Sequence, residues 1–126
     1  MDEGKVILLV DDDLTLREMY EERFRAEGFE IIQATNGEEA IQKAREAHPN
    51  IVLLDIMMPK VNGFDVLKNI KADSELKSTP VIILTALIQD VDREQGKSLG
   101  AVDYIVKSET MPGEVIAKIK NALGQK

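Results

Sequence analysis

The stretch IVLLD at residues 51–55 decides the fold, because a continuous run of branched apolar residues ends directly at a carboxylate. A run without polar alternation is typical of a strand whose two faces are both covered, as in a parallel sheet. Val6–Val10 and Val81–Leu84 have the same character, and they are followed by Asp11 and Thr85. These three runs predict the central strands of a buried sheet.

Two further strands are expected at the edges of this sheet, at Phe29–Ala34 and Ala101–Val106. Each contains an acidic residue, Glu30 or Asp103, and charge on an edge strand discourages pairing with another chain. Between the strands, apolar residues recur about every 3.6 positions, which predicts five amphipathic helices. The apolar helical positions are Leu16, Tyr20 and Phe24; Ala40, Ile41, Ala44 and Ala47; Val66, Leu67 and Ile70; Ile88, Val91 and Leu99; and Val115, Ile116, Ile119 and Leu123.

Alternating strands and helices predict an α/β fold made of five strand–helix units. Such units pair in parallel through right-handed crossovers, which gives an open sheet with helices on both faces. With the second and fifth strands at the edges, the expected strand order is 2-1-3-4-5. The sequence has no internal repeat, linker or low-complexity segment, so we expect a single domain over residues 1–126.

Composition narrows the functional classes. The chain has 126 residues, 44% of them apolar, which is enough for one domain with its own core. A net charge of −7 argues against direct nucleic-acid binding. Without cysteine and with one histidine, any metal must be bound by oxygen. Neither a membrane span nor a signal peptide is recognisable, so a cytoplasmic location is expected.

Chemically distinctive residues follow the predicted strands at their carboxyl ends. In an open parallel sheet the functional crevice lies at these ends, where the strand order reverses. Asp11 and Asp12 follow the first strand, Asp55 the third, Thr85 the fourth and Lys107 the fifth. Three carboxylates at one edge repel one another and need a cation, and oxygen ligands favour Mg²⁺, with Mn²⁺ or Ca²⁺ as substitutes. Lys107 and Thr85 suit a phosphoryl group, for which Asp55 is the best-placed nucleophile.

With these residues in place, the chain resembles a receiver domain of two-component response regulators along essentially its whole length. The resemblance is carried by ILLVDDD at 7–13, IVLLDIMMPKVNG at 51–63, VIILTA at 81–86 and DYIVK at 103–107. It implies a flavodoxin-like three-layer fold. It also implies a signalling switch that catalyses only its own phosphorylation and dephosphorylation, and residues 1–126 would then form a receiver without an effector domain.

The resemblance also implies roles for the acidic residues. The position of Asp55 accepts a phosphoryl group from the phosphohistidine of a sensor histidine kinase or a phosphotransfer protein. The positions of Asp11, Asp12 and Asp55 hold Mg²⁺, together with the backbone carbonyl of Met57. Met57 and Leu87 stand where the family tunes the chemistry, and since neither side chain can orient a water molecule, we expect a long-lived phosphoaspartate.

The remaining roles concern the switch. Thr85 and Lys107 match residues that contact the phosphoryl oxygens, and Tyr104 matches an aromatic residue that turns inward when the threonine moves. The change alters the face formed by the fourth helix, fifth strand and fifth helix, where a downstream protein target would bind a monomer or a phosphorylation-dependent dimer. Ser108 stands where the family has proline after a cis bond. A cis bond before a non-proline residue costs about 2.5 to 4 kcal/mol, so we expect a trans bond here.

The alternative function is a haloacid-dehalogenase-like phosphatase with Asp11 as nucleophile, Asp13 as acid/base, and Thr85 and Lys107 in the later motifs. It lacks the acidic pair that should follow the lysine strand and leaves Asp55 unexplained. An EF-hand loop at 11–22 lacks the glycine that its turn requires. A flavin-binding relative would bring its phosphate against the acidic run, and 4% aromatic residues offer little to stack on the flavin ring.

Overall fold

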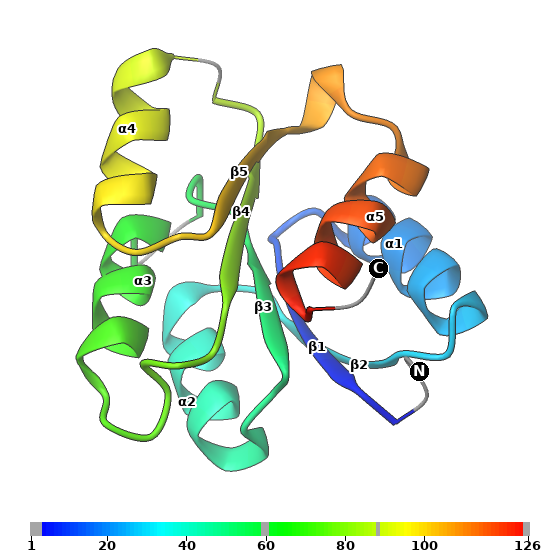
Figure 1. Cartoon of the computed structure of the whole chain (residues 1–126), viewed down its shortest axis with the longest axis horizontal. Coiled ribbons are helices and arrows are strands. Elements are labelled where there is room, and N and C mark those ends of the chain that lie inside the picture. Colours follow the sequence, from blue (N-terminus) through cyan, green and yellow to red (C-terminus); the bar gives the residue numbers. More distant parts are fainter. Residues whose placement is uncertain (1–3, 59–60, 88, 125–126) are drawn as a thin grey trace.

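Strands and helices alternate along the chain in the computed structural model, which describes residues 4–58, 61–87 and 89–124 (Figure 1). The strands are β1 (Val6–Val10), β2 (Glu30–Ala34), β3 (Ile51–Leu54), β4 (Val81–Thr85) and β5 (Asp103–Val106). The α-helices are α1 (Leu14–Ala26), α2 (Gly37–Ala47), α3 (Gly63–Ala72), α4 (Asp90–Ser98) and α5 (Pro112–Ala122), and a 3₁₀ turn, η1 (Lys107–Glu109), follows β5.

The five strands form one parallel sheet in the order β2-β1-β3-β4-β5, so the predicted α/β fold and strand order are confirmed. β1 pairs with β3 so that Val10 lies opposite Leu54. The residues that follow this pair therefore leave the sheet side by side. Both predicted edge strands lie at the edges of the sheet. Glu30 of β2 is exposed, and Asp103 of β5 forms an ion pair with Lys118 of α5.

Helices cover both faces of the sheet, with α1 and α5 on one face and α2, α3 and α4 on the other (Figure 1). Alternate side chains of each strand enter the two apolar layers. On β1, Ile7 and Leu9 pack with Tyr20 and Phe24 of α1, while Leu8 belongs to the layer beneath α2 and α3. Full burial on both faces explains why the central strands read as continuous apolar runs.

Local sequence signals set the beginnings of three helices. Asp13 accepts a hydrogen bond from the Leu16 N–H at 3.1 Å, and Asn36 and Asn62 cap α2 and α3 in the same way. Side-chain oxygens at this position satisfy N–H groups that the first helical turn leaves without partners. Gly63 opens α3 against the turn that follows β3, and a Cβ there would lie 2.3 Å from the Ile56 Cα.

The fourth helix departs most from the expected pattern. Val91 is 66% exposed instead of lying on an apolar face, although Leu99 does pack against the core. Ala47, at the end of α2, is exposed as well. Ile88 and Pro59 lie outside the described residues. Within the part of the chain that is described, no helix has the length and apolarity needed to cross a membrane.

Candidate functional site

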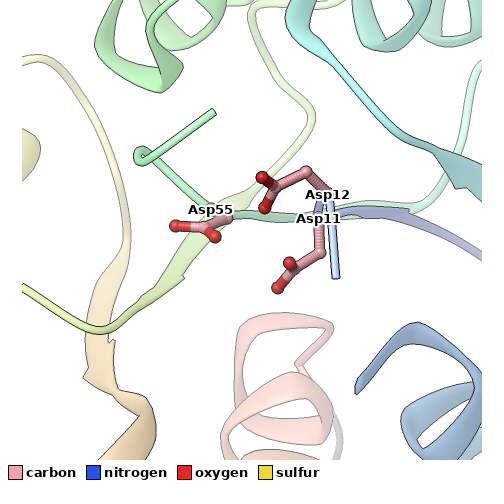
Figure 2. Close-up of side chains that lie close together, drawn as sticks. All are labelled: Asp11, Asp12 and Asp55. Carbon is pink, nitrogen blue, oxygen red and sulfur yellow. The ribbon is translucent and has the colours of Figure 1, made fainter. Parts of the chain in front are cut away.

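Three carboxylates converge at the carboxyl ends of β1 and β3 (Figure 2). Asp11 and Asp55 directly follow the paired residues of the two strands, and Asp12 is next along the chain. One oxygen from each lies within 4.8 Å of the others. Asp11 and Asp55 are only 2% and 4% exposed, whereas Asp12 faces solvent. Parallel pairing of the two strands therefore builds the acidic cluster predicted from the sequence.

Backbone amides orient the two buried carboxylates. The Asp13 N–H donates to Asp11 Oδ1 at 2.9 Å, and the Met57 N–H donates to Asp55 Oδ1 at 3.0 Å. The Asp55 N–H itself continues the β-ladder by donating to the Val10 carbonyl at 3.0 Å. Both side chains are thus held by the strand-to-helix turns, and the Met57 peptide lies beside Asp55.

Lys107 enters the cluster from the end of β5. Its Nζ lies 2.6 Å from Asp11 Oδ2 and 3.1 Å from Asp55 Oδ2. Burial raises the pKa of Asp11, and the contact with Lys107 offsets this only in part. Burial by itself lowers the pKa of Lys107, but the hydrogen bonds and charges of Asp11 and Asp55 outweigh it, so the pKa is raised. Lys107 therefore stays protonated at neutral pH.

Thr85 and Tyr104 both contact the turn after β4. Thr85 is fully buried, and its Oγ1 accepts a hydrogen bond from the Leu87 N–H at 3.4 Å. Tyr104 is 3% exposed, and its hydroxyl donates to the Leu87 carbonyl at 3.1 Å. The Arg93 guanidinium of α4 lies 5.3 Å from the centre of the tyrosine ring. Tyr104 is therefore inward in this structure, and Leu87 connects it to Thr85.

The peptide bond between Lys107 and Ser108 is trans, since the described residues contain no cis bond, and this expectation is confirmed. Directly after β5 the chain forms η1, and α5 begins at Pro112. The loop that carries the lysine is therefore a compact turn. It still presents the Lys107 amine to the acidic cluster.

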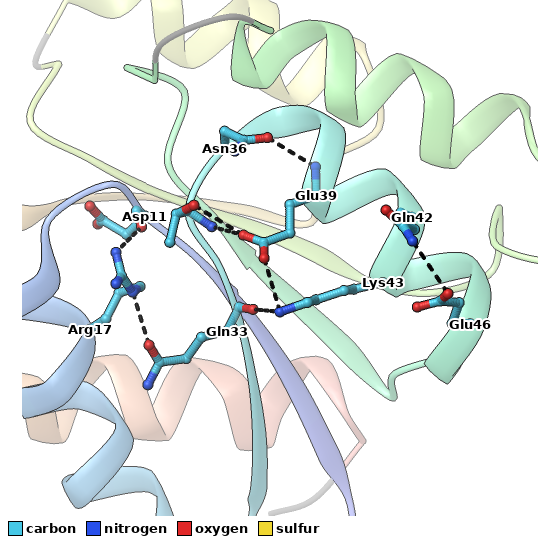
Figure 3. A network of polar contacts seen from close by, with 9 residues as sticks. Asp11, Arg17, Gln33, Asn36, Glu39, Gln42, Lys43 and Glu46 are labelled. Carbon is cyan, nitrogen blue, oxygen red and sulfur yellow. Dashed lines mark hydrogen bonds and ion pairs between the residues drawn. The ribbon is translucent and has the colours of Figure 1, made fainter.

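Sequence reasoning missed Arg17, whose side chain points toward Asp11 (Figure 3). Its side chain is buried, and its Nη1 donates to the Asp11 carbonyl at 2.8 Å. Its Nε donates to Gln33 Oε1 at 2.9 Å. A signal was present in the sequence, because Arg17 lies three and seven residues before Tyr20 and Phe24 and thus on their helical face. A charged residue inside an apolar face is unusual enough to mark the position.

The acidic cluster fits a small divalent cation. Three ionised carboxylates against one ammonium leave a charge of −2, and every candidate ligand atom is oxygen. Mg²⁺ binds oxygens at about 2.0 to 2.1 Å, so oxygens around one ion lie about 3 to 4 Å apart. The 4.8 Å limit of this cluster is close to that spacing. Small side-chain movements would complete the coordination.

Residues 7–120 match the family model described as the response regulator receiver domain. The chain belongs to this family. The receiver is 42% identical over 119 residues to the probable transcriptional regulator ycf27 of Cyanophora paradoxa, covering 94% of this chain and 48% of that protein. It is 44% identical over 117 residues to the CpxR homolog of Haemophilus influenzae, covering 93% and 49%. The chain thus spans about half the length of these curated relatives.

Solved structures agree with the family assignment. The chemotaxis protein CheY4 of Vibrio cholerae superposes with a TM-score of 0.87 at 29% identity, covering 94% of this chain and 98% of that one. The BeF3-activated N-terminal receiver domain of RstA from Klebsiella pneumoniae gives a TM-score of 0.88 at 26% identity, covering 96% and 100%. The likeness extends across nearly the whole of each chain.

Family membership makes this chain a phosphoacceptor signalling module with an acidic metal-binding site, and it decides against the phosphatase alternative. The structure supports the same conclusion. Asp13, the acid/base of that alternative, caps α1, and the two acidic residues that follow Lys107 in the sequence, Glu109 and Glu114, are exposed. The EF-hand alternative also fails, because α1 begins at Leu14, inside the stretch that would have to be the loop.

Proposed function

We propose that Asp55 accepts a phosphoryl group from the phosphohistidine of a sensor histidine kinase or a phosphotransfer protein. One observation carries the proposal: Asp55 is buried at the end of the middle strand, within the carboxylate cluster and 3.1 Å from the Lys107 ammonium. A nucleophile in this position has an ammonium group beside it that can meet an incoming phosphoryl group. The receiver would thus act as a phosphorylation-dependent switch.

In the transfer, a carboxylate oxygen of Asp55 attacks phosphorus. The new O–P bond forms while the P–N bond of the phosphohistidine breaks, and the imidazole nitrogen keeps the electron pair. Asp11, Asp12, Asp55 and the Met57 carbonyl would hold Mg²⁺, or Mn²⁺ in its place, and the bound ion would supply positive charge to the phosphoryl oxygens. Lys107 supplies a further charge from its present place beside Asp55.

The switch would begin at Thr85. A phosphoryl group brings about −1.5 to −2 charge and three acceptor oxygens, which attract the Lys107 ammonium and the Thr85 hydroxyl. Thr85 contacts the Leu87 N–H and Tyr104 contacts the Leu87 carbonyl, so movement of Thr85 reaches Tyr104 through this residue, and Tyr104, which already lies inward, would take the space that Thr85 leaves. The face formed by α4, β5 and α5 then changes for a downstream protein target, with the receiver as a monomer or as a phosphorylation-dependent dimer.

Intact-mass analysis after incubation with acetyl phosphate and Mg²⁺ tests the proposal. We expect one phosphoryl adduct on the wild type, none in EDTA and none on Asp55→Asn. Asp65→Asn is the matched control, because Asp65 is an exposed carboxylate on α3. We expect the adduct to persist, since Met57 and Leu87 cannot orient an attacking water. An adduct that survives Asp55→Asn would refute the assignment, and loss of the label within seconds would refute the expected lifetime.

A further inference from the structure

We propose that Arg17 is a positioning residue for the metal site: it fixes the peptide between Asp11 and Asp12 and thereby strengthens Mg²⁺ binding. The inference rests on the proposed function, because it assumes that these two carboxylates hold the ion. Arg17 itself contacts neither the ion nor the phosphoryl group. It acts from α1 through the backbone carbonyl of Asp11 (Figure 3).

The surroundings of Arg17 are unusual for a buried cation. The residue is 7% exposed, yet its hydrogen bonds go to neutral oxygens, the Asp11 carbonyl and the Gln33 amide. Among the described residues, no carboxylate forms an ion pair with it. Burying an unpaired charge costs several kcal/mol in general. An apolar side chain would fill this place on the core face of α1 at lower cost, so the guanidinium must provide something else.

Arg17 contacts Asp11, one of the three residues of the acidic cluster, and every polar group of Asp11 has a partner. The Asp11 N–H donates to the Ala34 carbonyl at 3.1 Å, and the two side-chain oxygens contact the Asp13 N–H and Lys107. The Asp11 carbonyl is the fourth polar group, and Arg17 binds it at 2.8 Å. This carbonyl belongs to the peptide that joins Asp11 to Asp12. Fixing it therefore limits the directions of two of the three carboxylates.

Arg17 is itself held in place by its neighbours. Gln33 accepts from Arg17 Nε and donates through its own Nε2 to Glu21. Glu21 pairs in turn with Arg25 at 2.7 Å, one helical turn further along α1. At the same position on β2, the Gln33 carbonyl accepts from Lys43 of α2 at 2.5 Å. The guanidinium is thus fixed between α1 and β2, as a positioning group must be.

Charge and position have opposite effects on metal binding. A nearby cation repels Mg²⁺, so if Arg17 acted only through its charge, its removal would tighten binding. If it acts by fixing the Asp11–Asp12 peptide, its removal weakens binding. Loss of partners that orient metal ligands typically costs 10- to 100-fold in affinity. The sign of the change therefore separates the two effects.

The test is a Mg²⁺ titration of the unphosphorylated receiver, followed by NMR at the Met57 amide, which donates to Asp55. We expect Arg17→Met to weaken binding about tenfold and Arg17→Lys to recover part of the affinity. Arg23→Met is the matched control, because Arg23 lies on the same helix, is exposed and stands outside the Arg17–Gln33–Glu21 contacts, and it should bind like the wild type. If Arg17→Met fails to fold, Gln33→Met, which removes the support of the guanidinium, should weaken binding in the same direction.

Unchanged or tighter binding in a folded Arg17→Met would overturn the inference. So would equal weakening by Arg23→Met. Failure of the proposed function is seen separately: the wild type would then bind no Mg²⁺, or Asp11→Asn would bind it as well as the wild type. At saturating Mg²⁺, Arg17→Met should still form the Asp55 adduct with acetyl phosphate, because the nucleophile and Lys107 remain.

Discussion

The Lys107 ammonium pairs with two buried carboxylates, and this pairing sets the pH range over which Lys107 stabilises the fold. Its pKa is raised, so its pairing stabilises the fold fully below its ordinary value of 10.5 and is lost as pH rises through the higher folded pKa. The raised pKa of Asp11 has the opposite sign. Because the ordinary pKa of aspartate is 3.8, the charged form of Asp11 destabilises the fold above pH 3.8. This destabilisation disappears as pH falls from the folded pKa to that value.

Glu39 offers a pH test at a distance from the acidic cluster. Its pKa is lowered, first by the hydrogen bond from the Thr35 N–H, which outweighs the opposing effect of burial, and then by Lys43. A lowered pKa means that the stabilisation is present above the ordinary value of 4.5 and is lost as pH falls below it. We expect Glu39→Gln to cost about 1 kcal/mol at pH 7, a modest value because the side chain is a third exposed. Urea unfolding between pH 3 and pH 7 measures it.

Glu38→Gln provides the matched control for this prediction. Glu38 lies in the same first turn of α2 and is exposed, and the described residues give its side chain no hydrogen bond or ion pair. It shares the helix-dipole contribution of Glu39 but not the contact with Thr35. The prediction fails if both variants lose the same stability or if the cost of Glu39→Gln is the same at acid pH.

The sequence predicted those site residues that directly follow the strands. Asp11, Asp55 and Lys107 come together because parallel strands place their carboxyl ends at one edge, and this requires only the strand order. The contact of Arg17 with the Asp11 carbonyl could not be predicted in the same way. It depends on how α1 packs and on which neutral oxygens its side chain reaches, which the periodicity of a helix does not specify.

At the scale of elements, α4 is the helix least anchored to the core. Among its residues only Gly96 is buried, and its N-terminus lacks a side-chain cap. Two contacts attach it to β5 and β4: Arg93 stacks on the Tyr104 ring, and Gly96 approaches both Tyr104 and Ile83. A helix with so little buried apolar surface is suited to shift when Tyr104 shifts.

Gly96→Ala tests this attachment. An added Cβ would lie 2.5 Å from Ile83 Cδ1 and 3.3 Å from Tyr104 Cδ2, so the buried Ile83 methyl or α4 must move, and the tyrosine ring must give slightly. We expect a loss of about 1 to 3 kcal/mol from overpacking, despite the gain of about 1 kcal/mol that alanine gives in an unhindered helix. Urea unfolding gives the change in stability, and the ring resonances of Tyr104 report whether it leaves its inward position.

Gly113→Ala is the corresponding control on α5. Nothing lies within 4 Å of the Cβ that it would add. Without a clash, this variant should be unchanged or more stable by up to about 1 kcal/mol. A Gly96→Ala variant that gains stability to the same extent would show that the close approach to Tyr104 imposes no constraint on α4.

The close approach of Gly96 to the sheet also explains why α4 was difficult to predict from the sequence. The central strands are apolar throughout, because both faces are covered, and this pattern fixed their number and order correctly. The α4 pattern is weak because a glycine makes the closest contact with the sheet, and glycine contributes nothing to an apolar periodicity. Val91 instead lies in solvent, where its apolar character misled the prediction.

On the scale of the whole molecule, folding brings like charges together. Asp11 and Asp55 are 44 positions apart in the sequence (55 − 11) and become neighbours only when β1 pairs with β3. Two carboxylates about 4 Å apart repel each other by roughly 4 kcal/mol at an effective dielectric near 20. Lys107 offsets part of this repulsion. The rest is an energetic cost of the fold, and a bound divalent cation would remove it.

Metal binding should therefore stabilise the entire receiver. A site with a Kd of about 1 mM gains about 1.4 kcal/mol in roughly 10 mM Mg²⁺, which raises Tm by about 4 to 6 °C. Calorimetry in Mg²⁺ and in NaCl of equal ionic strength measures the increment. Asp11→Asn should lose most of it, and Asp65→Asn, on the surface of α3, should keep it. An equal rise in Tm in NaCl, or in Asp11→Asn, would mean that general screening acts in place of a metal held at the ends of β1 and β3.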